Sequence, residues 1–512
     1  MVEQLIEGFV AAFTLWNLLF ITLGVAIGIL FGVMPGVGGI TALTLLIPVT
    51  FYMEPITAIA FLIGITKGST SGGAIPAILL NAPGSSENVA TARDGYPLAQ
   101  KGKPEKAMRM ALYSSVTGDF ASDVVLILLA APFAAIALKF GPAEITAVGL
   151  LAFTLIAGLS SDTLAKGLLA AAFGVFLSTV GLDRAEGTQR MTFGVIDLYD
   201  GISLNALAIG LLALSSVFSQ LFDSWRTPAD QLIKPKPYNK ADQNLTWAEF
   251  RACIPTLFRS AYIGTFVGML PGLGVTLAAF LGYGAAKRAS KEPEEFGKGK
   301  LEGIAATEAA NSAVTGANLI PTIALGIPGN IAAALLIGAF LIHGVTPGPF
   351  MMQQHGALIY GIFASMLMAN AVHLIVGRAG IPIWVLSLRV PKPIILSCVV
   401  VLCVVGVYVP SSSFFEIGLM FAFALLGFFM RKTGYSLVCL FIGFLLGPLL
   451  EHSLRQTIIL YDNAFVLFTR PFALPFTLLT LFFIWRFGIY HPARRRKERA
   501  AEADLNSRDI KK

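Results

Sequence analysis

The sequence predicts an all-α polytopic membrane protein. Hydrophobic residues make up 55% of the 512 residues and charged residues only 13%, about half the ~25% share of charge that a soluble domain carries. The mean hydropathy is +0.74, and the apolar residues gather in runs long enough to cross the ~30 Å of bilayer hydrocarbon. Because so little charge remains to cover a surface in water, these observations exclude a soluble enzyme.

About twelve membrane-spanning segments are expected from uninterrupted apolar runs. These runs are 56–80, 110–138, 143–160, 163–181, 201–221, 304–326, 330–345, 356–377, 393–409, 412–430, 433–450 and 471–488. Two further runs, 16–52 and 256–286, are also apolar, but a Pro-Gly pair interrupts each of them near its middle. The chain is therefore expected to consist of a first half, a cytoplasmic linker, a second half and a charged cytoplasmic tail, at 1–222, 223–255, 256–490 and 491–512.

Two ordered motifs recur in the two halves. The pattern GxxxGxxPGxG at 28–38 returns at 264–274, and the pattern IPxIxLxxPG at 75–84 returns at 320–329. The first motif is offset by 236 residues and the second by 245. A longer loop at 287–303 accounts for the difference between the offsets. Two motifs in the same order at a nearly constant offset indicate an internal repeat.

The basic residues of the loops predict how each half is oriented. In the first half, the connection 50–58 between the motifs has no Lys or Arg, whereas 93–109 after the second motif has five. In the second half the order is reversed: 287–300 has five basic residues and 341–356 has none. Because basic loops stay in the cytoplasm, we expect two halves of opposite topology, as in many secondary transporters. The alternative is duplication without inversion.

The interrupted runs are expected to be re-entrant hairpins. The stretches 222–252 and 287–303 are both basic and so both expected to be cytoplasmic, yet only the run 256–286 separates them. This run would then enter and leave by one side, turning at Pro271-Gly272, and its counterpart would turn at Pro35-Gly36 from the other side. A kinked helix that crosses once is the competing interpretation. The remaining basic loops place the C-terminus in the cytoplasm.

The four Pro-Gly breaks are the expected binding site. Broken backbone is tolerated in a membrane only inside protein or beside a wet cavity. Such breaks expose helix N-termini that suit anions and free carbonyl groups that suit Na⁺. The residues expected to bind substrate here are Pro35, Gly36, Gly38, Pro83, Gly84, Pro271, Gly272, Gly274, Pro328 and Gly329. For any single break, the alternative is a helix kink or close packing of small residues.

Polar residues next to the breaks complete the predicted site. Hydroxyl and amide groups can bind carboxylate oxygens or complete a Na⁺ shell, although each alone could equally bond a neighbouring helix. The candidates are Ser69, Thr70, Ser71 and Asn81 in the first half and Asn311, Ser312, Thr315 and Asn330 in the second. Thr70 and Thr315 correspond at the offset of 245, and a Na⁺ ion near them is the only bound ion that we expect. No other metal and no cofactor is expected.

Four charged residues are candidates for ion coupling. Lys67 and Glu308 lie within apolar segments, where ionisable groups are usually functional, although either could extend to an interface instead. Asp119 and Asp123 share a helix face and could carry protons or cations, cap nearby groups or lie near the cytoplasmic surface. They form the only acidic pair that would suit a membrane enzyme, but no Arg or His stands near them in the sequence. No catalytic motif is present, so an enzyme is not expected.

The motifs together resemble the large membrane subunit of the tripartite tricarboxylate transporter family. The residues that carry the resemblance are GxxxGxxPGxGG at 28–39, the stretches 78–84 and 94–99, and 308–312 leading to 319–322 and 325–329. The resemblance covers roughly 20–480 and includes both halves. Two departures concern the presumed site: Ser71 stands where the family often has an aromatic residue, and Ser312 follows Asn311 where a second Asn is typical.

The resemblance implies a permease of the bacterial inner membrane. Such a permease works with a small membrane subunit and a periplasmic solute-binding protein, and imports carboxylates such as citrate by cation-coupled transport without ATP. Coupling also has a physical reason: a di- or tricarboxylate brings two or three negative charges, Lys67 is the only obvious base near the breaks, and unpaired buried charge is very costly. A stand-alone organic-anion carrier, a membrane enzyme acting on lipids and a passive channel are the alternatives. A homodimer, and elevator or rocking motion, are left open.

Overall fold

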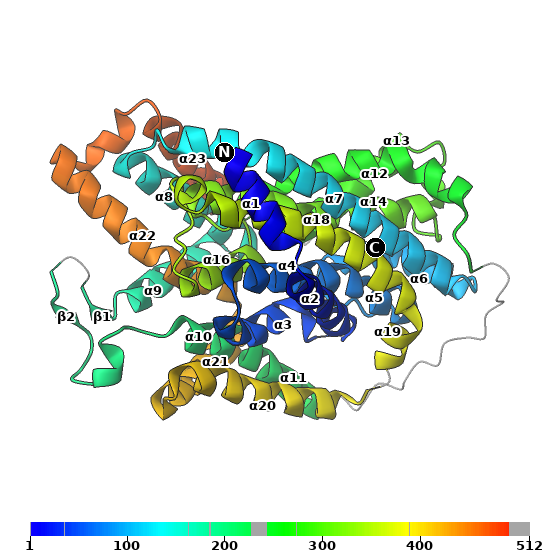
Figure 1. Cartoon of the computed structure of the whole chain (residues 1–512), viewed down its shortest axis with the longest axis horizontal. Coiled ribbons are helices and arrows are strands. Elements are labelled where there is room, and N and C mark those ends of the chain that lie inside the picture. Colours follow the sequence, from blue (N-terminus) through cyan, green and yellow to red (C-terminus); the bar gives the residue numbers. More distant parts are fainter. Residues whose placement is uncertain are drawn as a thin grey trace, which may run out of the picture. The chain divides into compact units, whose positions relative to one another are not determined.

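The computed structural model describes residues 2–34, 36–161, 163–183, 186–226, 243–272, 274–388 and 390–490 (Figure 1). The predictions for Pro35, for the tail 491–512 and for most of the linker therefore lie outside the described residues. Within the described ranges, eight helices are long and apolar enough to cross a membrane, and four shorter apolar helices accompany them. The only strands there are a two-residue pair. This confirms an all-α polytopic membrane protein.

The chain forms two compact units, and the larger one contains residues 1–138 and 202–429. Its helices up to residue 138 are α1 Val2–Ala12, α2 Leu15–Val33, α3 Gly38–Leu46, α4 Pro55–Gly72, α5 Ala74–Leu80, α6 Asn88–Gln100 and α7 Pro104–Ala137. From residue 202 they are α10 Leu204–Ala208, the π-helix η3 Ile209–Leu214, α11 Ser215–Arg226, α12 Trp247–Gly268, α13 Gly274–Ala289, α14 Leu301–Ala317, α15 Leu319–Leu325, α16 Ile331–Ile342, α17 Met351–Gln354, α18 Gly356–Ala379, α19 Ile381–Ser387, α20 Lys392–Ser411 and α21 Phe414–Thr433.

The smaller unit contains residues 139–201 and 430–512. Its main elements are α8 Pro142–Ser160, α9 Leu164–Ser178, the strands β1 Gly181–Leu182 and β2 Gln189–Arg190, α22 Leu437–Tyr461 and α23 Ala473–Trp485. Helix α22 packs against α8 and α9, and α23 packs against α8. An ion pair between Glu144 and Arg470, with 2.7 Å from Oε1 to Nε, fastens the start of α8. Helices from both sequence halves thus meet here, so the compact units do not follow the predicted division at 223–255.

Close packing at glycines shows the direction in which the chain of the larger unit runs through the two interrupted segments. On α2, Gly24, Gly28 and Gly32 press against the α4 carbonyl groups of Phe61, Ile65 and Ser69 in that order. Helices α2 and α4 are therefore parallel, and the chain between them must return to the level at which α2 began. In the second half, Gly264 and Gly268 of α12 pack in the same order against Ala310 and Val314 of α14. Both interrupted runs thus follow the path expected of hairpins, although their crossing of the bilayer stays a prediction.

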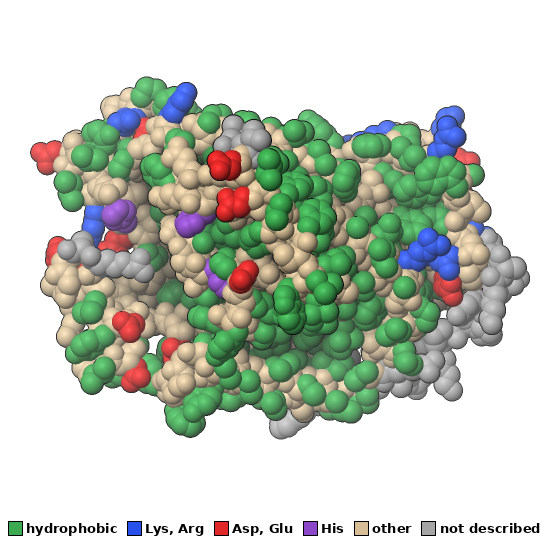
Figure 2. Space-filling model, in the orientation of Figure 1, with side chains coloured by type: hydrophobic (Ala, Val, Ile, Leu, Met, Phe, Trp, Pro, Cys, Tyr) green, Lys and Arg blue, Asp and Glu red, His purple; other side chains and the backbone are tan. Residues whose placement is uncertain are grey.

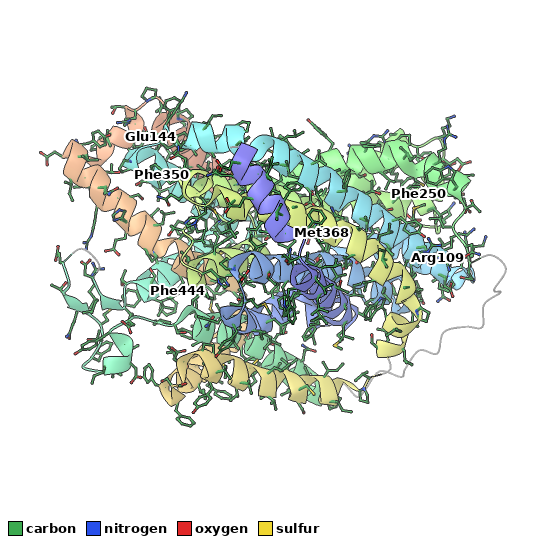
Figure 3. All side chains as sticks on the ribbon, viewed as in Figure 1. Arg109, Glu144, Phe250, Phe350, Met368 and Phe444 are labelled. Carbon is green, nitrogen blue, oxygen red and sulfur yellow. The ribbon has the colours of Figure 1, made fainter. Side chains whose placement is uncertain are left out.

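Three basic stretches meet at one end of the larger unit. Asp94 Oδ1 accepts the N–H groups of Gly297, Gly299 and Lys300, each at 2.9 Å. Lys106 Nζ lies 2.9 Å from Glu249 Oε1, and Figure 3 shows Arg109 and Phe250 at this same end. The stretches 93–109 and 287–303 and the end of the linker therefore lie at one end of the larger unit, an arrangement compatible with the prediction that all three face the cytoplasm.

Apolar side chains cover the outside of the larger unit. Figure 2 shows hydrophobic side chains over much of its viewed face, and Leu15, Trp16 and Ile375 are 84%, 69% and 67% exposed. Such exposure suits contact with lipid rather than with water.

Several predicted boundaries need correction. Helix α12 begins at Trp247, inside the predicted linker, because Thr246 and Glu249 form a capping box at its start. The predicted run 56–80 is divided at Gly73 and the run 304–326 at Asn318. In both, a proline three residues later, Pro76 or Pro321, has no N–H to continue the helix.

Candidate functional site

The two breaks of the first half lie together. Gly36, between α2 and α3, and Gly38, the first residue of α3, have φ of 88° and 69°, a conformation that favours glycine. The second break follows α5, which ends at the left-handed Asn81 (φ 54°). Gly84 of this second break donates its N–H to the Gly73 carbonyl at 3.4 Å. Its Cα also packs so closely on the Gly32 carbonyl, beside the first break, that no side chain would fit.

The second half repeats this arrangement at the same offsets. Gly272, between α12 and α13, and Gly274, the first residue of α13, have φ of 83° and 75°. Helix α15 ends at the left-handed Gly326 (φ 70°), which matches Asn81 at the offset of 245. The Gly272 N–H donates to the Gly329 carbonyl at 2.9 Å, so these two breaks also touch.

The halves meet at the breaks as well. Ser86 Oγ, just after Pro83-Gly84, lies 2.9 Å from Thr276 Oγ1, just after Pro271-Gly272 and Gly274. Helix α16, which follows Pro328-Gly329, packs against α3 and α4. The structure therefore brings all four breaks into one region of the larger unit, and none of them lies inside a continuous helix.

The predicted polar residues occupy different positions around these breaks. Ser69 and Thr70 each donate to the Thr66 carbonyl at 3.0 Å, and Asn330 caps α16 by accepting the Ala333 N–H at 2.9 Å. Asn81 is exposed, Thr315 is half-buried and Pro328 is buried. Ser69, Thr70 and Asn330 thus bond within or at the start of their own helices and not to a neighbouring helix, and only contact with a ligand would give them a further role.

Asn311 and Ser312 stand out because they are fully buried and unbonded. Neither amide atom of Asn311 nor Oγ of Ser312 has a hydrogen bond to any described residue, and both side chains are 0% exposed. Buried polar atoms in proteins almost always have a partner. These two residues are therefore the strongest candidates for binding a polar ligand.

Lys67 belongs to a buried cluster of charged groups. Its Nζ lies 2.7 Å from Asp123 Oδ2 and 3.7 Å from Asp119 Oδ1, and every one of these side chains is at most 1% exposed. Asn370 of α18 bridges the first pair, accepting from Lys67 Nζ and donating to Asp123 Oδ2, both at 2.8 Å. His373 Nδ1 lies 3.8 Å from Asp119 Oδ2. Lys67 therefore does not extend to an interface, and the aspartates do not lie at the surface.

Glu308 is buried beside this cluster without an ion pair among the described residues. Its carboxylate accepts from Thr91 Oγ1 at 2.5 Å, from Ser115 Oγ at 2.8 Å and from Asn88 Nδ2 at 3.4 Å. Asn88 Oδ1 in turn accepts from Ser85 Oγ at 2.5 Å, inside the second break. Glu308 thus connects a break to α7, and at 0% exposure it does not extend to an interface either.

Sequence reasoning missed Asn370 and His373. The observation that no His stands near Asp119 and Asp123 holds only along the chain, because His373 contacts Asp119 from α18 in space. A signal was present: Asn370 and His373 are an (i, i+3) polar pair in the apolar run 356–377. Two polar groups on one face of a membrane helix usually meet a partner there.

Comparison with known proteins agrees with this architecture. The model of the tripartite tricarboxylate transporter TctA family matches residues 18–442. A protein of Agrobacterium vitis, described as an uncharacterized 52.8 kDa protein in the TAR-I ttuC′ 3′ region, is 36% identical over 474 residues, covering 92% of this chain and 93% of that protein. An uncharacterized protein in the TAR-II ttuC′ 3′ region of the same organism is 37% identical over 211 residues, covering 41% of this chain and 87% of the relative. No solved structure matches significantly. The chain belongs to the tripartite tricarboxylate transporter TctA family, and is a multi-pass membrane component of such transporters.

Proposed function

We propose that this chain is the permease subunit of a binding-protein-dependent secondary transporter that imports citrate-like di- and tricarboxylates across the bacterial inner membrane. The observation that carries the proposal is the meeting of four backbone breaks in one region of the larger unit. The fully buried Asn311 and Ser312 side chains, which have no hydrogen bond to a described residue, add polar groups on α14 that a ligand could use. Backbone opened in this way supplies N–H and C=O groups for a charged solute inside a membrane protein. Membership of the TctA family supports the transporter class.

The helix starting at the first break offers the clearest anion-binding groups. Helix α3 begins after Val37, whose side chain makes no cap, so its first N–H groups have no side-chain acceptor from that position. At α16, by contrast, Asn330 already caps the start. We therefore assign carboxylate recognition to the N-terminus of α3 together with the Asn311 amide and the Ser312 hydroxyl.

The buried ion pair argues for cation coupling. Lys67 was the one base expected near the substrate, but its ammonium group is already engaged by Asp123 at 2.7 Å and Asn370 at 2.8 Å. It therefore leaves little charge to balance a carboxylate, and unbalanced charge inside the protein is costly. A co-transported Na⁺, near Thr70 and Thr315, or a proton supplies the balance in our proposal. The two inverted halves would expose the site alternately to the two sides.

The proposed partners follow from the family. A tripartite transporter adds a small membrane subunit and a periplasmic binding protein that delivers the solute, and the basic loops place the C-terminus of this chain in the cytoplasm. The test is uptake of radiolabelled citrate and a panel of other di- and tricarboxylates into cells that produce the chain with both partners. Accumulation against a gradient that collapses with the ion gradients is expected. The absence of uptake for every acid in the panel would reject the proposal.

Asn311 gives a sharper test of the site. Replacing Asn311 with leucine of similar size should lower carboxylate uptake at least tenfold without lowering thermal stability, because the amide makes no hydrogen bond to described residues. The matched control is Asn17→Leu, since Asn17 is equally buried but donates to Ala12 O at 2.7 Å and Ser365 Oγ at 2.8 Å. That control should lower the melting temperature. Full uptake by Asn311→Leu would show that the Asn311 amide does not contribute to substrate binding.

A further inference from the structure

The two aspartates of the buried charge cluster differ in their hydrogen bonds. Asp123 Oδ2 pairs with Lys67, and Asn370 bridges the two through both of its amide atoms, so that only Asp123 Oδ1 has no hydrogen bond to a described residue. By contrast, neither carboxylate oxygen of Asp119 makes a hydrogen bond to a described residue, and neither does His373 Nδ1. Met368, labelled in Figure 3, marks this stretch of α18.

The net charge of the cluster differs from zero by one unit. One lysine and two aspartates with a neutral histidine carry a net charge of −1, and the side chains of Lys67, Asp119, Asp123 and His373 are all at most 1% exposed. A buried carboxylate without a full partner is strongly destabilising. A single added proton makes the cluster neutral and gives it two ion pairs, Lys67 with Asp123 and His373 with Asp119.

Ser71 lets His373 accept this proton without a change in the backbone. Its Oγ lies 2.5 Å from His373 Nε2 and 3.3 Å from the Gly68 carbonyl. With a neutral ring, Nδ1–H faces Asp119 and Ser71 donates to Nε2. With the ring protonated, Nε2–H donates to Ser71, whose hydroxyl turns to Gly68. The Ser71 hydroxyl and His373 Nε2 therefore keep a hydrogen-bond partner in both states.

The cluster also touches the proposed substrate site. Ser71 lies two residues before Gly73, whose carbonyl accepts the Gly84 N–H of the second break at 3.4 Å. A rearrangement of that break on carboxylate binding therefore acts directly on the hydroxyl that faces His373. The Lys67 cluster and the breaks share helix α4.

We propose that the His373–Asp119 pair binds the proton that is transported together with the carboxylate, which deepens the proposed function and rests on it. The proton adds to the Nε2 lone pair of His373 as the loaded carrier forms and leaves the same atom on the cytoplasmic side. No bond other than N–H forms or breaks.

Other charged groups around α18 are few and separate. The cluster itself supplies Lys67 from α4 and Asp119 and Asp123 from α7; α2, α17 and α19 contribute none. Arg378 on α18 and Glu3 and Glu7 on α1 are exposed, and Glu105, Lys106 and Arg109 lie at the start of α7, more than two turns before Asp119. Glu308 on α14 is a further buried acid, and its carboxylate accepts hydrogen bonds from Thr91, Ser115 and Asn88.

The experiment measures proton entry into proteoliposomes that contain the complete transporter, using a pH dye trapped inside them. Citrate and the other acids of the carboxylate panel are added outside to drive the entry. Wild type and His452→Asn, an exposed histidine, should move protons with the carboxylate. Asp119→Asn and His373→Asn should lose at least tenfold of the proton signal. Uptake driven by a Na⁺ gradient alone, or an unchanged proton signal in Asp119→Asn, overturns this proposal while the proposed function stands.

A second readout does not depend on transport. Solid-state ¹⁵N NMR of histidine-labelled protein in liposomes resolves the ring protonation state of the five histidines, and His373→Asn assigns the relevant signal. We expect both the neutral and the protonated ring of His373 to be seen across a series of samples prepared at different pH, and Asp119→Asn to remove the protonated form. A ring that keeps one protonation state throughout overturns the assignment, even where no carboxylate is transported.

Discussion

Replacing Lys67 with methionine is expected to abolish carboxylate uptake and to reduce the folded yield severely. The ammonium group is fully buried and holds Asp123 at 2.7 Å and Asn370 at 2.8 Å. Removing it leaves two buried carboxylates without a cation, and breaking a buried pair from one side destabilises proteins by about 3–5 kcal/mol. Thermal unfolding in detergent and uptake per folded molecule measure the two effects.

The double variant Lys67→Met/Asp123→Asn tests whether the charge of Lys67 or the packing of its long side chain stabilises these helices. Neutralising both partners of a buried pair is often close to neutral for stability, and the new amide can still bond Asn370. We therefore expect the double variant to regain most of the melting temperature that Lys67→Met loses, but not its transport. A double variant as unstable as Lys67→Met would show that packing of the long lysine chain, and not its charge, holds these helices.

Adding one methyl group at Gly84 or Gly329 is expected to lower uptake at least tenfold. At Gly84, a Cβ would clash with the Gly32 carbonyl oxygen and lie 3.0 Å from Gly73 Cα. At Gly329, the equivalent position, it would clash with Asn318 and lie 2.9 Å from its Cγ. Overpacking of this kind costs about 1–3 kcal/mol, and a tenfold effect on an equilibrium needs only about 1.4 kcal/mol.

The control for these variants is Gly284→Ala on α13. Apart from the backbone of α13 itself, the only atom of the described residues within 4 Å of a Cβ there is Arg288 Nη2 at 3.7 Å, at the end of a flexible side chain. Its uptake should match that of wild type. If Gly84→Ala and Gly329→Ala also transport at nearly the wild-type rate, then close contact of the breaks is not needed for transport.

The breaks themselves could be read from the sequence, because Pro-Gly inside an apolar run admits few structures. Proline removes a donor at a fixed position, and glycine adopts at little cost the positive φ seen at Gly36, Gly38, Gly272 and Gly274. The repeat then predicted that each break has a counterpart, and the equal ends of α5 and α15 at the offset of 245 agree with that.

The partners of the buried charges could not be read in the same way. Asn370 lies 303 residues from Lys67 in the sequence, and which face of α18 turns toward α4 depends on packing that involves α1, α2 and α7 as well. The helices that make up the smaller unit could not be predicted for the same reason. Helices α8 and α9 are apolar on most sides, so nothing local indicates that α22 and α23 will cover them.

The central claim is that the two halves meet at their breaks to form one site, and a disulfide between Ser86 and Thr276 tests it most directly. Their hydroxyl oxygens lie 2.9 Å apart, a separation compatible with a disulfide, whose Cβ atoms lie about 3.5–4.5 Å apart. The cysteine pair is introduced into a chain whose four native cysteines, at 253, 398, 403 and 439, are replaced by alanine. A pair with Thr22→Cys in place of Thr276→Cys is the control.

Mild oxidation should protect both new thiols from a maleimide mass tag and stop carboxylate uptake, and a reductant should restore both. The control pair should stay labelled and active. If Ser86→Cys/Thr276→Cys keeps two free thiols under oxidation, the second break of the first half is not beside the first break of the second half, and the account of a shared site is wrong.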